Sequence, residues 1–186
     1  KDKNADSLKE ALRNVAGITF NAGEGGRIGD NVNLRGYSAV GDLYLDNIRD
    51  YAQYNRETFN VQQIDVLKGA SSMLFGRGST GGVINQVSKT AQPVDSNEIT
   101  VTGGSNSYKR ATVDLNKAIT DNVAFRLNAM GTKSTSERSD ATSKRYGIAP
   151  TLTIGAGTQD EVNLSYYYVN EKNVPDYGVP YFNGKP

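Results

Sequence analysis

The strongest constraint on the fold is a period-two alternation of apolar and polar side chains in the second half of the chain. It recurs in five segments, at residues 99–103, 111–117, 123–130, 146–154 and 162–169. Successive side chains of a β-strand point to opposite faces, so this pattern predicts strands with one apolar and one polar face. We expect the five strands to form an antiparallel meander.

A soluble β-sandwich would show the same alternation. Other features of the sequence are therefore needed to distinguish a sandwich from a transmembrane barrel. No stretch approaches the ~20 apolar residues of a membrane-spanning helix. A transmembrane β-barrel is favoured by strands of about ten residues and by tyrosines at 166–168 near a strand end. Short turns at 120–122 and 155–160 also alternate with a longer loop at 134–144. Lipid would then face the apolar side chains, and the lumen the polar ones, which include Arg126.

The composition excludes several functions. The 186 residues carry 21 basic and 20 acidic side chains, a net charge of +1 that gives no reason to expect nucleic acid. Cysteine and histidine are absent, so disulfides, zinc sites and the usual general base are absent too. We therefore expect neither an enzyme nor a resident metal or cofactor.

The first half of the chain predicts a mixture of short helices and strands. Ser7 and Glu10 have the spacing of a capping box, so we expect a helix over 7–15 and a strand at 18–20 after it. Asp46 and Asn47 separate two short apolar segments and indicate a hairpin turn. Further strands are expected at 32–36, 64–68 and 83–87, and a short helix at 57–62.

A cluster of structure-breaking residues at 92–97 divides the chain. We predict one domain over 1–92, a linker over 93–97, and the first five barrel strands over 98–186. If the first strand runs from the inner to the outer side of the membrane, the fifth runs in the same direction, because successive strands of a meander alternate in direction. The tail after residue 173, which is rich in proline, glycine and aromatics, would then be an extracellular loop.

A glycine-rich segment at 76–82 matches the dinucleotide-binding pattern G-x-G-x-x-G letter for letter. That motif must follow a strand and open a helix, whereas here the glycines precede a β-branched run. A phosphate-binding P-loop is excluded because Gly69 and Gly76 are too far apart and Arg77 stands where lysine is required. The glycines therefore predict close backbone approach and not nucleotide binding.

Four ordered blocks in the first half together resemble a known family. They are Asn33–Gly36, Ile64–Gly69, Leu74–Gly78 and Gly81–Asn85. They look like the plug domain of TonB-dependent outer-membrane receptors, most closely the ferric-siderophore branch. The resemblance is strong over residues 7–90, and the remainder is similar to the first part of the family's barrel. It implies an α+β plug with a small mixed sheet and short helices, followed by antiparallel transmembrane β-barrel strands.

The resemblance also implies a function. A family barrel of about 22 strands needs on the order of 400 residues, so this chain is expected to be an N-terminal fragment of a plugged barrel. The receptor would be a monomer in the outer membrane of a Gram-negative bacterium, in contact with its lipid. It would take up a ferric siderophore, of catecholate type, driven by TonB through an N-terminal segment outside this chain. Iron would enter already chelated.

Two alternatives stay open. One is a receptor of the same family with another cargo: a hydroxamate siderophore, cobalamin, haem or a glycan. The other is a soluble β-rich binding module.

The resemblance suggests roles for three sets of residues. The expected ligand contacts are Arg27, Tyr37, Tyr51, Tyr54, Tyr177 and Tyr181. The charges expected to lock the plug are Arg35, Asp65, Lys68 and Arg77. The structural glycines are Gly36, Gly69, Gly76, Gly78, Gly81 and Gly82.

Overall fold

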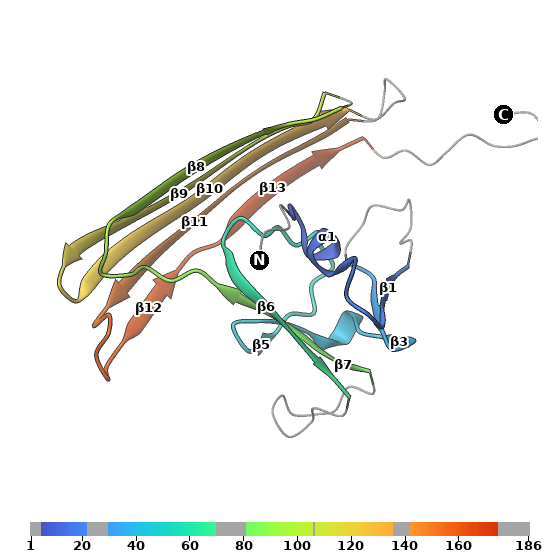
Figure 1. The fold of residues 1–186 in the computed structure, drawn as a ribbon, viewed down its shortest axis with the longest axis horizontal. Coiled ribbons are helices and arrows are strands. Elements are labelled where there is room, and N and C mark those ends of the chain that lie inside the picture. The colour runs from blue at the N-terminus through green and yellow to red at the C-terminus, as the bar shows by residue number, and fades with distance from the viewer. Residues whose placement is uncertain (1–4, 22–29, 70–80, 106, 136–141, 175–186) are drawn as a thin grey trace, which may run out of the picture.

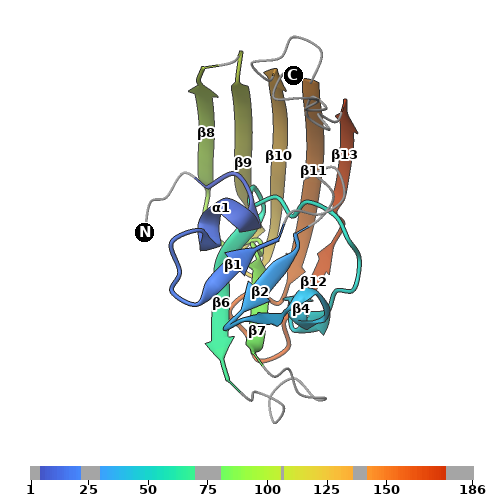
Figure 2. The same ribbon diagram turned by 90° about the vertical axis from the view of Figure 1, so that its right-hand side faces the viewer.

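The computed structural model describes residues 5–21, 30–69, 81–105, 107–135 and 142–174. They form a curved antiparallel sheet with a smaller α+β unit packed against one of its faces (Figures 1 and 2). We call the curved sheet the wall and the described residues 5–91 the plug. Within the described ranges no helix is long and apolar enough to span a membrane.

The wall contains the predicted strands in the predicted meander order. Hydrogen bonding runs in the order β12-β11-β10-β9-β8, and β13 pairs with β11. The strands are β8 (Ser96–Gly103), β9 (Lys109–Thr120), β10 (Val123–Thr135), β11 (Thr142–Ile154), β12 (Val162–Ser165) and β13 (Tyr168–Asn173).

Several wall strands are longer than the alternation indicated. β10 and β11 have 13 residues each and remain paired as far as Thr135 and Thr142. They therefore occupy part of the loop expected at 134–144. β8 likewise begins at Ser96, inside the expected linker. In these regions polar side chains lie on both faces. The backbone hydrogen bonds between the strands therefore continue into segments where the sequence no longer alternates between apolar and polar residues.

The predicted fifth strand is interrupted, and a proline explains the interruption. β12 pairs with β11 from Thr151 and β13 pairs from Ile148, in the same register. Between them, the N–H of Tyr166 donates to the carbonyl of Pro150 at 3.0 Å. Proline has no N–H to return that bond, so one rung of the ladder is missing at this point.

The described residues of the plug form two small sheets, one α-helix and a short 3-10 helix, η2 (Val40–Asp42). β1 (Ile18–Phe20), β2 (Val32–Leu34) and β3 (Tyr37–Ser38) form the first sheet in that order. The second has the order β5-β4-β7-β6, with β4 and β7 parallel, and so is mixed as expected. Its strands are β4 (Leu43–Leu45), β5 (Ile48–Arg49), β6 (Val61–Lys68) and β7 (Gly82–Ser88).

The helix of the plug, α1 (Leu8–Leu12), is shorter than predicted. Its cap forms as expected: the Ser7 hydroxyl accepts from the N–H of Glu10 at 3.4 Å, and the Glu10 carboxylate accepts from the N–H of Asp6 at 2.9 Å. The helix ends early because Arg13 already donates to the carbonyl of Glu10 in a tighter turn, at 3.3 Å. Leu8 and Leu12 still enter the plug core, which also contains Ile18, Val32, Leu34, Ala39, Leu43 and Ile84.

The short helix predicted at 57–62 is wrong. Glu57 forms an isolated antiparallel bridge with Ser7, and β6 already begins at Val61. The carbonyl of Asn60 accepts from the N–H of Lys89 at 2.8 Å. Pairing with distant segments therefore overrides the local preference for a helix here.

Two of the predicted structural glycines allow the plug sheets to approach each other closely. A Cβ on Gly81 would lie 2.3 Å from the carbonyl oxygen of Leu34 on β2, and a Cβ on Gly82 would lie 2.5 Å from Cδ2 of the same leucine. Gly36 and Gly69 have positive φ angles of 85° and 101°. Gly76 and Gly78 lie outside the described residues.

Candidate functional site

A buried carboxylate of the plug lies between two arginines of the wall. The side chain of Glu57 is 0% exposed. Its Oε2 lies 2.9 Å from Nη2 of Arg110 on β9, and its Oε1 lies 2.5 Å from Nη1 of Arg145 on β11. Burial raises the pKa of Glu57, and the two guanidinium groups act in the opposite direction. This pair of contacts ties the plug to two different wall strands.

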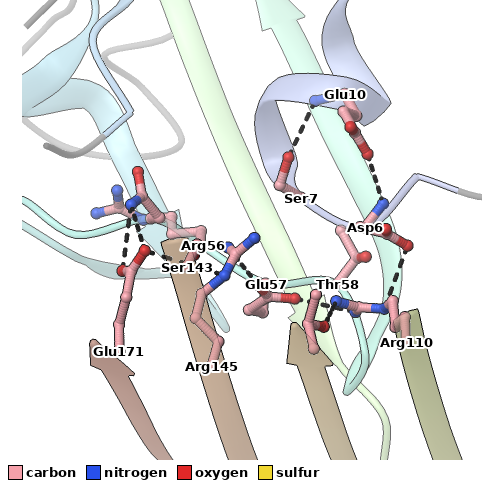
Figure 3. Close-up of polar contacts among 12 residues, drawn as sticks. Asp6, Ser7, Glu10, Arg56, Glu57, Thr58, Arg110, Ser143, Arg145 and Glu171 are labelled. Carbon is pink, nitrogen blue, oxygen red and sulfur yellow. Dashed lines mark hydrogen bonds and ion pairs between the residues drawn. The ribbon is translucent and has the colours of Figure 1, made fainter. Parts of the chain in front are cut away.

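The N-terminal segment of the plug extends the same set of contacts. Nε of Arg110 lies 3.2 Å from Oδ1 of Asp6, and the hydroxyl of Tyr108 also donates to Asp6. On the plug side, Thr58 donates through its N–H to the carbonyl of Asp6 at 3.4 Å and through its hydroxyl to the carbonyl of Ala5. Residues 5–7 are therefore held between the wall and the segment around Glu57 (Figure 3).

At the opposite end, the contacts reach β13. Both carboxylate oxygens of Glu171 accept from the side-chain amide of Asn55 in the plug, each at 3.2 Å. Nε of Arg145 lies 3.9 Å from Oε1 of Glu171. Negative and positive side chains thus alternate along the boundary, with Asp6 and Glu57 from the plug and the other three from the wall (Figure 3). We call this set the charge ladder: Asp6, Arg110, Glu57, Arg145 and Glu171.

A second polar contact joins the plug to the middle of the wall. Asp114 on β9 accepts from Arg126 on β10 through two bonds of 2.7 Å. It also accepts from Nζ of Lys89 in the plug at 2.8 Å. Arg126 in turn donates to the carbonyl of Thr90 at 3.0 Å. Arg126 therefore faces the plug, as the alternation predicted.

One apolar contact accompanies these polar ones. Phe59 of the plug stacks on Tyr167 with ring centroids 5.9 Å apart, and it packs against Met130 and Ala149 of the wall. A Cβ on Gly147 would lie 2.8 Å from Cγ2 of Val169, 3.0 Å from the carbonyl oxygen of Tyr168 and 3.2 Å from Cζ of Phe59. The glycine therefore leaves the space into which the phenylalanine ring fits.

The three described tyrosines that were predicted to bind ligand differ in exposure and in their partners. Tyr37 and Tyr51 are 56% and 68% exposed. Tyr51 accepts a 2.9 Å hydrogen bond from Arg49. Tyr54 is half-buried instead: its hydroxyl donates to Asp50 at 2.7 Å, and the guanidinium carbon of Arg56 lies 4.4 Å from its ring centroid.

Burial raises the pKa of Tyr54, and its hydrogen bond to Asp50 acts in the same direction. The other three predicted contacts, Arg27, Tyr177 and Tyr181, lie outside the described residues. The ligand-binding role of all six residues stays a prediction.

The locking role predicted for Arg35, Asp65, Lys68 and Arg77 stays a prediction. Arg35, Asp65 and Lys68 form no ion pair with another described residue, and Asp65 accepts instead from the side chain of Gln63 at 3.2 Å. Arg77 lies outside the described ranges. Within those ranges, the plug contacts the wall through the charge ladder and through Lys89. The signal for the wall arginines was present in the sequence, because they lie on the polar side of alternating strands.

A polar cleft of about 310 Å³ opens beside the charge ladder. It lies between the plug and the ends of β10, β11 and β13. Its lining residues are Ser7, Lys9, Asp30, Asn55, Ser134, Ser143, Arg145, Glu171 and Asn173. In the described part of the chain, no three His, Cys, Asp or Glu residues are grouped so as to hold a metal ion.

Comparison with known proteins covers both parts of the structure. The profile of the TonB-dependent Receptor Plug Domain family matches residues 1–83. The probable TonB-dependent siderophore receptor PiuA of Acinetobacter baumannii is 41% identical over 98% of this chain. The catecholate siderophore receptor Fiu of Escherichia coli O157:H7 is 39% identical over 97% of it. The chain spans 25% and 24% of the length of these two relatives.

Solved structures agree with the sequence relatives. The crystal structure of PiuA from Acinetobacter baumannii superposes with a TM-score of 0.89, covering 98% of this chain and 26% of that one at 42% identity. The open form of Fiu from Escherichia coli K12 superposes with a TM-score of 0.86, covering 96% of this chain and 26% of that one at 36% identity.

Proposed function

This chain belongs to the TonB-dependent receptors of the Gram-negative outer membrane, and we propose that the receptor takes up a ferric siderophore of the catecholate class. The predicted family, fold class and location are confirmed by the plug-domain match and by relatives that align along nearly the whole chain. The relatives are receptors, in agreement with the prediction that the chain is not an enzyme.

The observation that carries the proposed cargo is the identity of 39% to Fiu, a catecholate siderophore receptor, across plug and wall together. The alternative cargo, a hydroxamate siderophore, is supported less strongly. The ferrioxamine receptor of Yersinia enterocolitica is 32% identical over 81% of this chain.

The two faces of the wall support its placement in lipid. Large apolar side chains project from the face opposite the plug and are more than a third exposed, among them Ile99, Val101, Phe125, Ile148 and Leu164. The other face is polar and meets the plug, and it includes Arg110, Asp114, Arg126 and Arg145. This division into an apolar outer face and a polar lumen suits a transmembrane barrel.

In the proposed mechanism the plug closes the lumen, and transport needs no bond to be made or broken in the ligand. Iron arrives as a chelate, which suits a chain without cysteine and histidine. Release to the inner side requires the contacts of the charge ladder to be broken. TonB, acting through a segment N-terminal to residue 5, would reach the ladder first at Asp6.

The test is a binding panel on the full-length receptor in detergent. Isothermal titration calorimetry would compare a ferric tris-catecholate, a ferric trihydroxamate, cobalamin and haem. We expect saturable binding of the ferric tris-catecholate alone. Selective binding of the trihydroxamate would replace the catecholate assignment by the alternative. Binding of cobalamin or haem, or of none of the four, would overturn the ferric-siderophore proposal.

A further inference from the structure

A row of exposed lysines crosses one rim of the wall, on the face opposite the plug. Lys133 of β10 lies directly opposite Lys109 of β9 and Lys144 of β11, and Lys144 lies opposite Lys172 of β13. This is the rim at which β8, β10 and β13 end and β9 and β11 begin, the upper one in Figure 2. Lys109, Lys144 and Lys172 are each next in sequence to a member of the charge ladder, so their side chains point away from the plug. We call these four residues the lysine row.

The lysine row concentrates positive charge that the described residues do not balance. Neighbouring strands lie about 4.8 Å apart, so the four ammonium groups share a length of about 14 Å, and like charges directly opposite one another destabilise a sheet. None of the four forms an ion pair with a described carboxylate. The described strand residues that share their face include no aspartate and no glutamate. The compensating charge must therefore come from outside these residues.

The other rim of the same face is different. Lys117 also lies on β9, and its exposed side chain pairs with Asp95. That lysine is neutralised within the chain, whereas the lysine row is not. In a barrel whose first strand runs outward, as expected from the sequence, the lysine row lies at the outer rim. An anion that balances it would be supplied at the outer surface of the membrane, next to the apolar face of the wall.

A shallow hollow opens beside the lysine row. Its volume is about 380 Å³, and its lining includes Val101, Ala111 and Gly131 together with three lysines of the row. A Cβ on Gly131 would meet nothing within 4 Å, so the missing side chain leaves open space on the surface. Tyr146, directly opposite Gly131 on β11, is 54% exposed. An apolar hollow with ammonium groups at its edge suits an acyl chain that carries an anionic headgroup.

We propose that the lysine row binds the phosphorylated headgroup of a lipid of the outer leaflet, and that the hollow takes one of its acyl chains. A phosphate monoester carries a charge of about −1.5 to −2 at neutral pH. Two such groups balance four lysines, so the fitting lipid has two phosphates on its headgroup, as in the acylated disaccharide lipid A. Bound there, one headgroup would offset the repulsion between the lysines of neighbouring strands. The inference does not depend on which cargo the receptor takes up.

The experiment uses the full-length receptor in a neutral detergent and measures lipid binding by native mass spectrometry. The probes are lipid A with two phosphates, monophosphoryl lipid A and phosphatidylcholine. The variants are Lys133→Gln and the double variant that adds Lys144→Gln. Their control is Lys117→Gln, which removes an exposed lysine from the same face at the other rim. Gly131→Leu fills the hollow and leaves every charge in place. The gel mobility of each unheated receptor shows that its barrel is folded.

We expect the wild type and Lys117→Gln to bind lipid A equally well. One lysine near a membrane surface changes the affinity for anionic lipid about fivefold, so Lys133→Gln should bind lipid A about fivefold more weakly and the double variant about 25-fold. Gly131→Leu should also bind more weakly, because its side chain occupies the hollow. Monophosphoryl lipid A should bind the wild type more weakly than lipid A. An excess of inorganic phosphate should not displace lipid A, because phosphate has no acyl chain.

Four results would contradict the inference. Equal binding of lipid A by the wild type and the double variant would show that the lysine row is not the site. Equal binding of lipid A and phosphatidylcholine would show that the lysines recognise no phosphate pattern and only anchor the wall at the membrane surface. Displacement of lipid A by inorganic phosphate would assign the row to a free anion, and unchanged binding by Gly131→Leu would remove the acyl chain from the hollow. The proposed function is tested separately, by the binding panel with ferric chelates.

Discussion

Glu57 is the residue whose replacement tests the plug–wall contact most directly. Glu57→Gln keeps the size of the side chain and removes its charge. The carboxylate is 0% exposed, and its partners Arg110 and Arg145 are 4% and 19% exposed. Removing one member of a buried ion pair typically costs about 3–5 kcal/mol, because the partner charge is left without compensation. Arg110 keeps Asp6 and Arg145 keeps Glu171, so we expect the lower end, about 3 kcal/mol.

The measurement is pulse proteolysis of the full-length receptor in urea, which gives the free energy of plug unfolding by linear extrapolation. Glu161→Gln is the control, since Glu161 is an exposed carboxylate in the turn before β12. The double variant Glu57→Gln with Arg110→Gln should lose less free energy of unfolding than the sum of the losses in the two single variants. A loss below about 0.5 kcal/mol for Glu57→Gln would refute the view that the ladder holds the plug, because surface substitutions have effects of that size.

Three further predictions concern neighbouring features. Phe59→Ala should destabilise the plug by about 3–5 kcal/mol in the same assay, since the ring is buried against the wall; an unchanged urea midpoint would contradict this. Gly147→Val should cost about 1–3 kcal/mol by overpacking Val169, the Tyr168 carbonyl and the Phe59 ring, and the double variant with Phe59→Ala should recover only the part of that loss due to the ring. Burial and the hydrogen bond to Asp50 raise the pKa of Tyr54, so the unfolded chain loses its phenolic proton first and plug stability should fall as pH rises above about 10. Tyr54→Phe should reduce this alkaline loss, measured as the urea midpoint against pH; an equal loss in both proteins would assign it to other groups.

Features set by nearest neighbours in the sequence were predictable. The turn at Asp46 and Asn47 forms as expected, with positive φ angles of 50° and 66° at the two residues. The alternating strands form the wall because every shift by one residue would turn the apolar face inward. The cap at Ser7 forms because its partner Glu10 is only three residues away.

Features that depend on distant segments were not predictable in the same way. Glu57 meets Arg110 and Arg145 only after three wall strands and the plug have packed, and nothing near Glu57 in the sequence indicates either partner. The helix expected at 57–62 failed for the same reason, since pairing with Ser7 decides the backbone there. The family resemblance grouped Tyr54 with Tyr51, and the sequence did not indicate that the hydroxyl of Tyr54 donates to Asp50 within the plug.

The order of the charge ladder has a mechanical consequence. Its members lie in a row that begins at Asp6, next to the N-terminal end of the described plug. A pull on the chain before Ala5 would load Asp6 first, then Glu57, and Glu171 last. The contacts would then break one after another and not all at once. The peak force needed to unseat the plug would then be set by its single strongest contact, the one around Glu57, and not by the sum of them all.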